Sequence, residues 1–232
     1  MPKVMILTGS DGNPRSFPPS ELLELEATYP YLLRDCFKDS TFWQLSWGNV
    51  TTMALLNQPM AYLTHWNPDI IIVQSGMVDC RPEAFSDFQK ELISKFTWKF
   101  FSRIKKYVEN PFWIKRRQIY RVSPGSFRTT IKRFKLTFPK AKIFWIEICA
   151  GPRYEEAKPG VHQRMKEYNE IIKKELGDDL VLVQEKMMEV NGFNAVDHLH
   201  WNKRGNQAVA DMLTEKMNRY LSQRQGVAHE QQ

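Results

Sequence analysis

The stretch Val4-Met5-Ile6-Leu7-Thr8-Gly9-Ser10-Asp11-Gly12 decides the fold, because a continuous apolar run ends abruptly at residues that favour a turn. Short continuous apolar runs are typical of strands that helices cover on both faces of a sheet. The glycines and Asp11 favour a tight turn with exposed backbone amides. We therefore expect a buried strand whose carboxyl end delivers Ser10 into a loop.

The rest of the chain repeats this alternation of short apolar runs and longer helical stretches. Further strands are expected at 69–74, 142–148 and 180–184. Helices are expected at about 19–26, 51–65, 84–108, 127–137, 160–175 and 203–223. The alternation predicts an α/β fold with a parallel sheet, whose ligands bind at the carboxyl ends of the strands. The loops 8–16 and 75–82 are therefore the first places to look for a site.

Length and composition are those of one globular domain. The 232 residues are 42% hydrophobic and 12% aromatic, which excludes the disordered and collagen-like classes. We expect a single domain over 1–223 with a polar tail at 224–232. No stretch approaches the roughly 18 uncharged apolar residues of a membrane span. Residues 1–7 lack the features of a signal peptide, so we expect a cytoplasmic protein.

The cysteines argue against both a disulfide framework and a zinc site. The chain has three of them, Cys36, Cys80 and Cys149, without the spacing of metal ligands. An odd, sparse set indicates reduced thiols. We expect no metal.

The net charge of +7 is concentrated in one segment. Between Lys99 and Lys142 there are 14 basic residues and a single acidic one, Glu109. The segment Lys95–Arg128 is longer than a simple connection, and we interpret it as a basic, aromatic, helical insert. Its apolar helical face is expected to run from Ile93 to Val108, followed by the aromatic pair and the three cations of Phe112-Trp113-Ile114-Lys115-Arg116-Arg117.

Three roles for this insert remain open. The aromatic side chains could pack on the sheet while the cations are simply solvated. A basic amphipathic helix with Trp and Phe could instead lie on an anionic membrane surface. Binding of single-stranded nucleic acid ranks last, because no nucleic-acid-binding motif accompanies the charge.

A possible acid–base pair precedes the last expected helix. Asp197 and His200 are three residues apart, so on a turn the carboxylate could bind one imidazole nitrogen and leave the other for a nucleophile. The alternative is a capping aspartate beside a surface histidine. A serine nucleophile is expected at Ser10, where the turn would expose both its hydroxyl and its backbone amide. Ser16 and Ser75 remain alternatives.

Several short blocks, in order along the chain, resemble those of the SGNH (GDSL-type) hydrolase family, in particular a bacterial branch whose third block reads Gly-x-Val-Asp-Cys. The first block is Ile6 to Arg15, which is similar to Gly-Asp-Ser-Leu-x-x-Pro-Arg. The others are Thr28-Tyr29-Pro30-Tyr31-Leu32-Leu33, Gly48-Asn49-Val50-Thr51, Gly76-Met77-Val78-Asp79-Cys80-Arg81-Pro82 and Asp197-His198-Leu199-His200-Trp201-Asn202-Lys203-Arg204-Gly205. Their order and spread are more specific than any single block.

The resemblance implies a flavodoxin-like three-layer α/β/α sandwich and hydrolysis of carboxylic esters without a cofactor. It assigns Ser10 as the nucleophile, His200 as the general base and Asp197 as the acid that orients it. The oxyanion hole would contain the backbone amides of Ser10 and Gly48, with Asn49 as a further candidate.

Two positions depart from the family pattern. The first block has Thr8-Gly9-Ser10 where Gly-Asp-Ser is usual. In the third block Val78 stands where the family has an asparagine whose side chain donates to the oxyanion, and valine has no such donor. Losing one donor costs a factor of about 10²–10³ in turnover. Asn49, Gln74 or Arg81 could compensate.

Substrate contacts are expected from Arg15, Asp79 and Trp201. Asp79 has the alternative role of supporting the loops through backbone amides, and Arg15 that of a structural ion pair. With Trp47 and Tyr29 near the expected site, we favour an esterase that removes an acetyl or similar small acyl group from a carbohydrate. The alternatives are an O-acyltransferase with the same triad, and a non-catalytic protein that docks through the insert.

Overall fold

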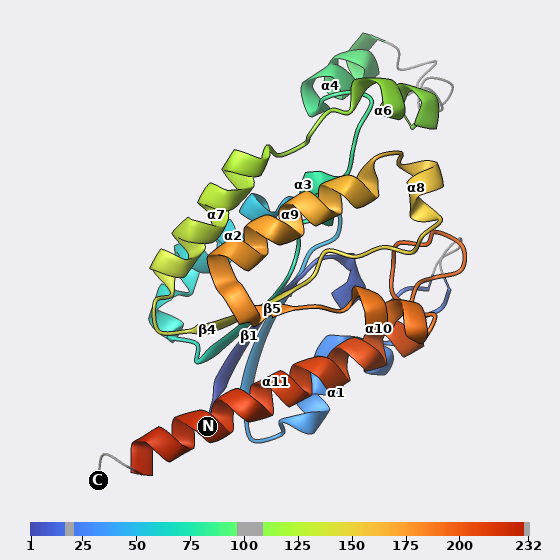
Figure 1. Cartoon of the computed structure of the whole chain (residues 1–232). Coiled ribbons are helices and arrows are strands. Elements are labelled where there is room, and N and C mark those ends of the chain that lie inside the picture. The colour runs from blue at the N-terminus through green and yellow to red at the C-terminus, as the bar shows by residue number, and fades with distance from the viewer. Residues whose placement is uncertain (17–20, 97–108, 230–232) are drawn as a thin grey trace.

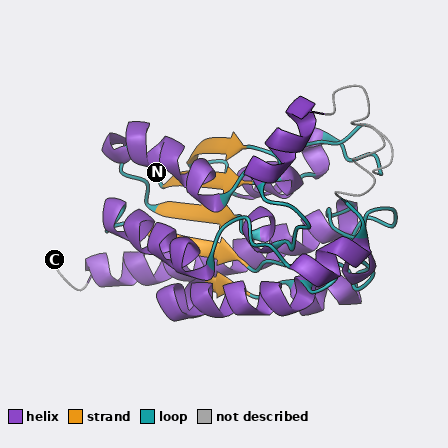
Figure 2. Ribbon diagram, turned by 90° about the horizontal axis from the view of Figure 1, so that it is seen from above, coloured by secondary structure: helices purple, strands orange, loops and turns teal. Residues whose placement is uncertain are grey.

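A five-stranded parallel sheet forms the centre of the computed structural model, which describes residues 1–16, 21–96 and 109–229. The strand order is β2-β1-β3-β4-β5, and the arrowheads in Figure 2 all point the same way. The chain therefore moves from β1 to one side and then to the other, so that a topological switch point lies beside β1. The strands are β1 (Lys3–Thr8), β2 (Thr41–Ser46), β3 (Ile70–Gln74), β4 (Lys142–Ile146) and β5 (Leu180–Val181).

Helices join the strands and cover the sheet. The α-helices described are α1 (Tyr29–Cys36), α2 (Thr52–Tyr62), α3 (Met77–Cys80), α4 (Asp87–Phe96), α6 (Pro111–Arg117), α7 (Pro124–Thr137), α8 (Tyr154–Ala157), α9 (Val161–Leu176), α10 (Gln184–Glu189) and α11 (Lys203–His229). Short 3₁₀ helices lie at Ser10–Gly12, Leu25–Ala27, Thr64–Trp66 and Gly177–Asp179.

The sheet separates two hydrophobic cores, which follow from the alternation of side chains along each strand. Met5 and Leu7 of β1 pack with α2, α7 and α9, whereas Val4 and Ile6 pack with α1 and α11. Figure 1 shows these two groups of helices on opposite faces of the sheet. The structure thus confirms the expected three-layer α/β/α sandwich with a central parallel sheet.

Several local expectations were wrong. Strand β2 was missed because it is an edge strand with only partly buried side chains and polar residues. The helix expected at 19–26 does not form over the described residues 21–24, where Leu23 pairs with Arg15 as an antiparallel bridge. Helix α1 begins at Tyr29 instead. The last helix, expected to end at 223, continues as α11 to His229.

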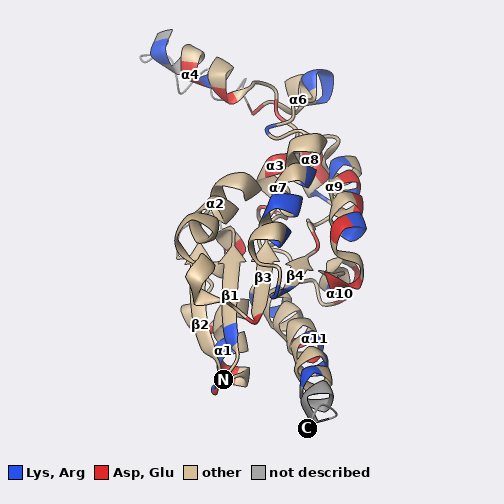
Figure 3. Ribbon diagram, turned by 90° about the vertical axis from the view of Figure 1, so that its left-hand side faces the viewer, with Lys and Arg blue, Asp and Glu red and all other residues tan. Residues whose placement is uncertain are grey.

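The helices α4 and α6 project from one end of the described structure. Figures 1 and 3 place α4 and α6 beyond α3 and α8, at the end opposite the two termini. Most of the apolar helical face expected from Ile93 to Val108 lies outside the described residues. Helix α6, which was not expected as a separate element within the helical insert, is capped by the side chain of Asn110. Among the described helices, none is long and apolar enough to cross a membrane.

Candidate active site

Ser10 lies at the switch point of the sheet, immediately beyond β1. The chain turns there into the 3₁₀ helix Ser10–Gly12, which places the serine at the carboxyl end of the strand. Gly12 is needed for this turn to pack against the strand, since a Cβ atom built on it would lie 2.1 Å from Cγ2 of buried Thr8. The tight turn therefore follows from a glycine two residues after the serine.

A second loop, between Phe193 and Trp201, brings His200 to the same place. The two ends of this loop form an antiparallel bridge, and the backbone amide of Asn194 donates to the His200 carbonyl at 2.7 Å. The buried side-chain oxygen of Asn194 also accepts from the backbone amides of Val196 and Asp197. This internal bonding holds the loop in shape just before α11 begins.

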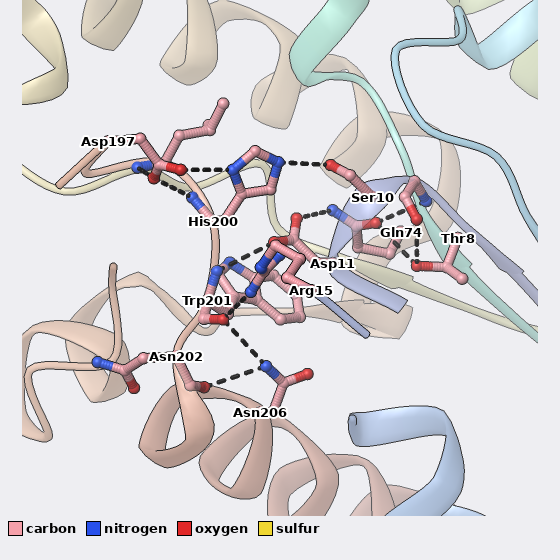
Figure 4. A network of polar contacts seen from close by, with 12 residues as sticks. Thr8, Ser10, Asp11, Arg15, Gln74, Asp197, His200, Trp201, Asn202 and Asn206 are labelled. Carbon is pink, nitrogen blue, oxygen red and sulfur yellow. Dashed lines mark hydrogen bonds and ion pairs between the residues drawn. The ribbon is translucent and has the colours of Figure 1, made fainter. Parts of the chain in front are cut away.

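Ser10, His200 and Asp197 form a continuous line of hydrogen bonds (Figure 4). Ser10 Oγ lies 2.8 Å from His200 Nε2, and His200 Nδ1 lies 2.8 Å from Asp197 Oδ2. The other carboxylate oxygen of Asp197 accepts from the backbone amides of Leu199 at 2.9 Å and His200 at 3.0 Å. The structure thus brings together all three residues that the sequence analysis chose, with the geometry of a nucleophile, a base and an orienting acid.

The electrostatics of the pair suit a general base. Burial alone would lower the pKa of His200, but the hydrogen bond that its Nδ1–H donates to Asp197 and the charges of Asp11 and Asp197 raise the pKa above its ordinary value. For Asp197, burial favours the neutral acid, yet the hydrogen bonds from His200 and the backbone amides hold its pKa well below the usual range. Asp197 therefore stays ionised, and a carboxylate in this position is able to stabilise a positive charge on the His200 ring.

Asp11 and Gln74 join the two loops, a role that was not expected for either residue. The carboxylate of buried Asp11 accepts from the Trp201 backbone amide at 3.0 Å and from Gln74 Nε2 at 2.9 Å. The Gln74 Oε1 atom accepts from the Gly9 amide at 2.8 Å and from Thr8 Oγ1 at 3.0 Å. Asp11 is therefore a cross-link between the serine loop and the histidine loop. Its place next to Ser10 was the available sequence signal.

A cavity of about 390 Å³ opens beside the triad. Ser10 and His200 line it, together with Trp47, Gly48 and Asn49 from the loop after β2. Gly48 lies close to the serine, since a Cβ atom built on it would be 3.8 Å from Ser10 Cβ. We call this space the catalytic cavity.

The two alternative serines are placed differently from Ser10. Ser75 lines the catalytic cavity, but its hydroxyl is hydrogen-bonded to Thr52 Oγ1 at 2.8 Å. Ser16 is exposed and is not among the cavity residues. Of the three serines, Ser10 is the one whose hydroxyl is bonded to the imidazole.

The residues that could replace the missing oxyanion donor have different surroundings in the structure. Val78 lines the catalytic cavity, as the resemblance leads one to expect of that position. Gln74 is engaged at both ends of its amide, as described above, and Arg81 is paired with Glu83 at 3.1 Å. Asn49 accepts from Arg121 Nη1 at 3.4 Å through Oδ1, so its Nδ2 group remains for another acceptor. Its φ of +55° is a left-handed conformation that asparagine tolerates.

The three expected substrate contacts have different surroundings. Trp201 is 1% exposed, lines the catalytic cavity, and packs its ring 5.7 Å from that of Tyr29. Asp79 faces the interior instead, where it accepts from the Thr52 backbone amide and hydroxyl, both at 2.9 Å. Arg15 donates to the Trp201 carbonyl and lies 3.6 Å from Asp11. Neither Asp79 nor Arg15 is among the residues that line the catalytic cavity.

Within residues 1–16, 21–96 and 109–229, no group of three His, Cys, Asp or Glu side chains could hold a metal ion. The cysteines are unpaired, with Cys80 and Cys149 buried and Cys36 exposed.

No protein-family model matches this sequence, and no curated protein sequence matches it. Solved structures do match. A lipase/acylhydrolase from Enterococcus faecalis aligns over 94% of this chain and 95% of its own, with a TM-score of 0.63 at 12% identity. A GDSL-like lipase from Parabacteroides merdae aligns over 92% and 94%, with a TM-score of 0.59 at 12% identity.

An acetylxylan esterase from Geobacillus stearothermophilus, solved as a catalytic mutant, aligns over 92% of this chain and 93% of its own. Its TM-score is 0.57, again at 12% identity. The similarity covers nearly the whole of each chain, in agreement with the fold that the resemblance implied. The chain therefore has the fold of the SGNH (GDSL-type) hydrolases.

Proposed function

We propose that this protein is a serine esterase that works through an acyl-serine intermediate. The observation that carries the proposal is the line of two 2.8 Å hydrogen bonds from Ser10 through His200 to Asp197, at the edge of an open cavity. Nucleophile, base and orienting acid are thereby within proton-transfer distance before any substrate binds.

In this mechanism His200 Nε2 takes the proton of Ser10 as Oγ attacks the carbonyl carbon of the ester. The resulting imidazolium then protonates the leaving alkoxide, and an alcohol departs. A water molecule, activated by the same imidazole, attacks the acyl-serine and releases the carboxylic acid, which restores Ser10. The ionised Asp197 stabilises the imidazolium in both halves of the reaction.

The oxyanion would be bound by the backbone amides of Ser10 and Gly48 and by the side-chain amide of Asn49. Asn49 supports this role in two ways: it lines the catalytic cavity, and Arg121 occupies its oxygen, which leaves the nitrogen to donate. In this proposal Asn49 supplies the donor that Val78 lacks, from the loop after β2 instead of the loop after β3.

A small acyl group on a carbohydrate is the substrate that we favour. The catalytic cavity has room for an acetyl group, and Trp47, which is 46% exposed, offers an aromatic face at its edge. Such faces bury the apolar side of a sugar ring. The acetylxylan esterase among the matching structures lends support to this choice.

The test is hydrolysis of p-nitrophenyl acetate by the wild-type protein and by Ser10→Ala. We expect Ser10→Ala to lose at least a thousand-fold in kcat/KM, whereas the matched control Ser16→Ala keeps wild-type activity. Equal rates for wild type and Ser10→Ala would refute the proposal. Adding methyl glucoside as an acceptor separates hydrolysis from the alternative O-acyl transfer, because the transferase would yield more acetylated sugar than acetate.

The insert supports a second proposal, docking on an anionic membrane. Phe112 is 62% exposed and Trp113 38% exposed, and the three exposed cations Lys115, Arg116 and Arg117 follow on the same short helix. Figure 3 shows these basic residues on α6, away from the sheet. Exposed aromatic and basic side chains together are typical of surfaces that bind anionic lipids.

Sedimentation with vesicles tests this docking. We expect binding to vesicles that contain phosphatidylserine, and none to vesicles of phosphatidylcholine alone. Replacing Lys115, Arg116 and Arg117 by glutamine should abolish it. The control variant replaces three exposed lysines of α9, Lys166, Lys173 and Lys174, by glutamine. It loses the same charge and should still bind the vesicles. Equal losses in both triple variants would contradict a specific docking surface.

A further inference from the structure

A second cavity, of about 710 Å³, adjoins the catalytic cavity. Asn49 and Arg81 line both spaces, so the two meet at the loop that carries the candidate oxyanion donors. Beyond them the second cavity extends toward α4 and α6. A substrate held at Ser10 could therefore reach into it. We call this space the cationic cavity.

The inner part of the cationic cavity carries more positive than negative charge. Glu83 is its one buried carboxylate, and two cations share it: Arg81 at 3.1 Å, and Lys90. Lys158 also lines the cavity and is half-buried, yet it makes no ion pair with any residue of the described chain. Arg81, Lys90 and Lys158 thus line the cavity together with one buried carboxylate, and a bound anion would relieve the mutual repulsion of these cations.

The outer part is closer to neutral. Asp87 is bonded to Lys90 at 3.3 Å and to Arg121 at 3.0 Å, and Arg121 continues to Asn49. Glu109 lies at the exposed edge. The surplus of positive charge therefore belongs to the inner part, beside the partly buried side chains of Arg81 and Lys158.

We propose that the cationic cavity binds a carboxylate or phosphate group carried by the substrate, so that the esterase acts on acylated acidic sugars or sugar phosphates. This inference rests on the proposed esterase function and names its substrate class. The anion would lie against Lys158 and Arg81 while the ester lies at Ser10.

Two properties of the cations support this role. The Nε atom of Arg81 is buried and has no hydrogen-bond partner in the described structure, so it is a donor without an acceptor. Burial, followed by the positive charge of Arg81, lowers the pKa of the Lys158 ammonium, although Glu83 and Glu109 act in the opposite direction. An anion placed between the two cations would supply the missing acceptor and favour the charged form of Lys158.

Calorimetric titration of the full chain with inorganic phosphate and with D-glucuronate tests the site, with D-glucose as the neutral counterpart of glucuronate. We expect saturable binding of phosphate, of glucuronate, or of both, and binding of glucose at least five-fold weaker. Lys158→Met should weaken anion binding at least five-fold, whereas Lys158→Arg, which keeps the charge, should bind the anion as the wild type does. The control Lys140→Met removes an exposed lysine at the other end of the sheet and should bind as wild type does.

Three results of this titration would overturn the proposal. Failure of both anions to bind, glucose binding as well as glucuronate, or equal anion binding by Lys158→Met and wild type would each contradict it. Binding of one anion alone identifies the group that the cavity takes. Calorimetry needs no turnover, so it separates this proposal from the esterase proposal: Ser10→Ala should bind the anion normally even if the ester is never hydrolysed.

Discussion

Replacing Asn49 by glycine tests the proposed oxyanion hole most sharply. The backbone at Asn49 is left-handed, with φ of +55°, so alanine would add strain, whereas glycine adopts this conformation freely. The substitution therefore removes the side-chain amide and leaves the turn intact. The lost hydrogen bond from Arg121 is long, at 3.4 Å, and exposed, so its contribution to folding is small.

The expected loss of rate in Asn49→Gly follows from the number of hydrogen-bond donors that remain in the proposed oxyanion hole. With two backbone amides remaining at Ser10 and Gly48, loss of the third donor should lower kcat for p-nitrophenyl acetate about 10²–10³-fold, or about 2.7–4 kcal/mol of transition-state stabilisation. KM should change little, because the donor acts on the developing charge.

A double variant extends this test. Val78 lines the same cavity, and asparagine is the residue that the family pattern has there, so Val78→Asn in the Asn49→Gly background should recover part of the lost rate. The thermal midpoints of both variants should stay near that of the wild type. An Asn49→Gly enzyme with kcat within about three-fold of the wild type would refute the assignment of Asn49 as a donor.

Three further predictions follow from the geometry and the charges. In a pH–rate profile, the rate should fall in acid with a midpoint above 6.5, the ordinary pKa of histidine, because protonated His200 cannot act as a base. Asp197→Asn should move this midpoint to lower pH and lower kcat by a factor of about 10⁴. Gly205→Ala places a Cβ atom 2.2 Å from a backbone carbonyl oxygen, so a thermal melt should show a loss of about 1–3 kcal/mol in stability. The control Gly125→Ala, whose Cβ atom would have no neighbour within 4 Å, should melt as the wild type does. Burial raises the pKa of Asp79 from 3.8 to about 6, so between these pH values the folded state binds more protons than the unfolded state. The free energy of unfolding should therefore fall as the pH rises from about 4 to about 6. Asp79→Asn should remove this pH dependence in urea titrations.

The parts of the fold that the sequence predicted are those with continuous apolar runs. β1, β3 and β4 are buried on both faces, so their composition alone distinguishes them from helices and loops. β2 escaped prediction because an edge strand has partly exposed side chains and keeps polar residues such as Gln44. α1 begins with Tyr29-Pro30, and its short length leaves too few turns for a clear helical period.

The candidate triad was accessible from the sequence for a different reason. Asp197 and His200 are neighbours in the chain, and Ser10 follows a strand whose end is fixed by the apolar pattern, so short-range information sufficed. The contacts that hold the site together are long-range. Asp11 bonds to Trp201 and Gln74, and Arg121 bonds to Asn49, in each case across a separation that no local pattern reveals.

The most direct test of the account is covalent labelling by a fluorophosphonate, which reacts with an activated serine. Mass spectrometry of the digested protein should show one adduct, on Ser10, and the rate of labelling should fall steeply in His200→Ala, because the hydroxyl then lacks its base. The account predicts this adduct in the wild type and none in Ser10→Ala. Unlabelled Ser10 in the folded wild-type protein, or a label on another serine, would contradict it.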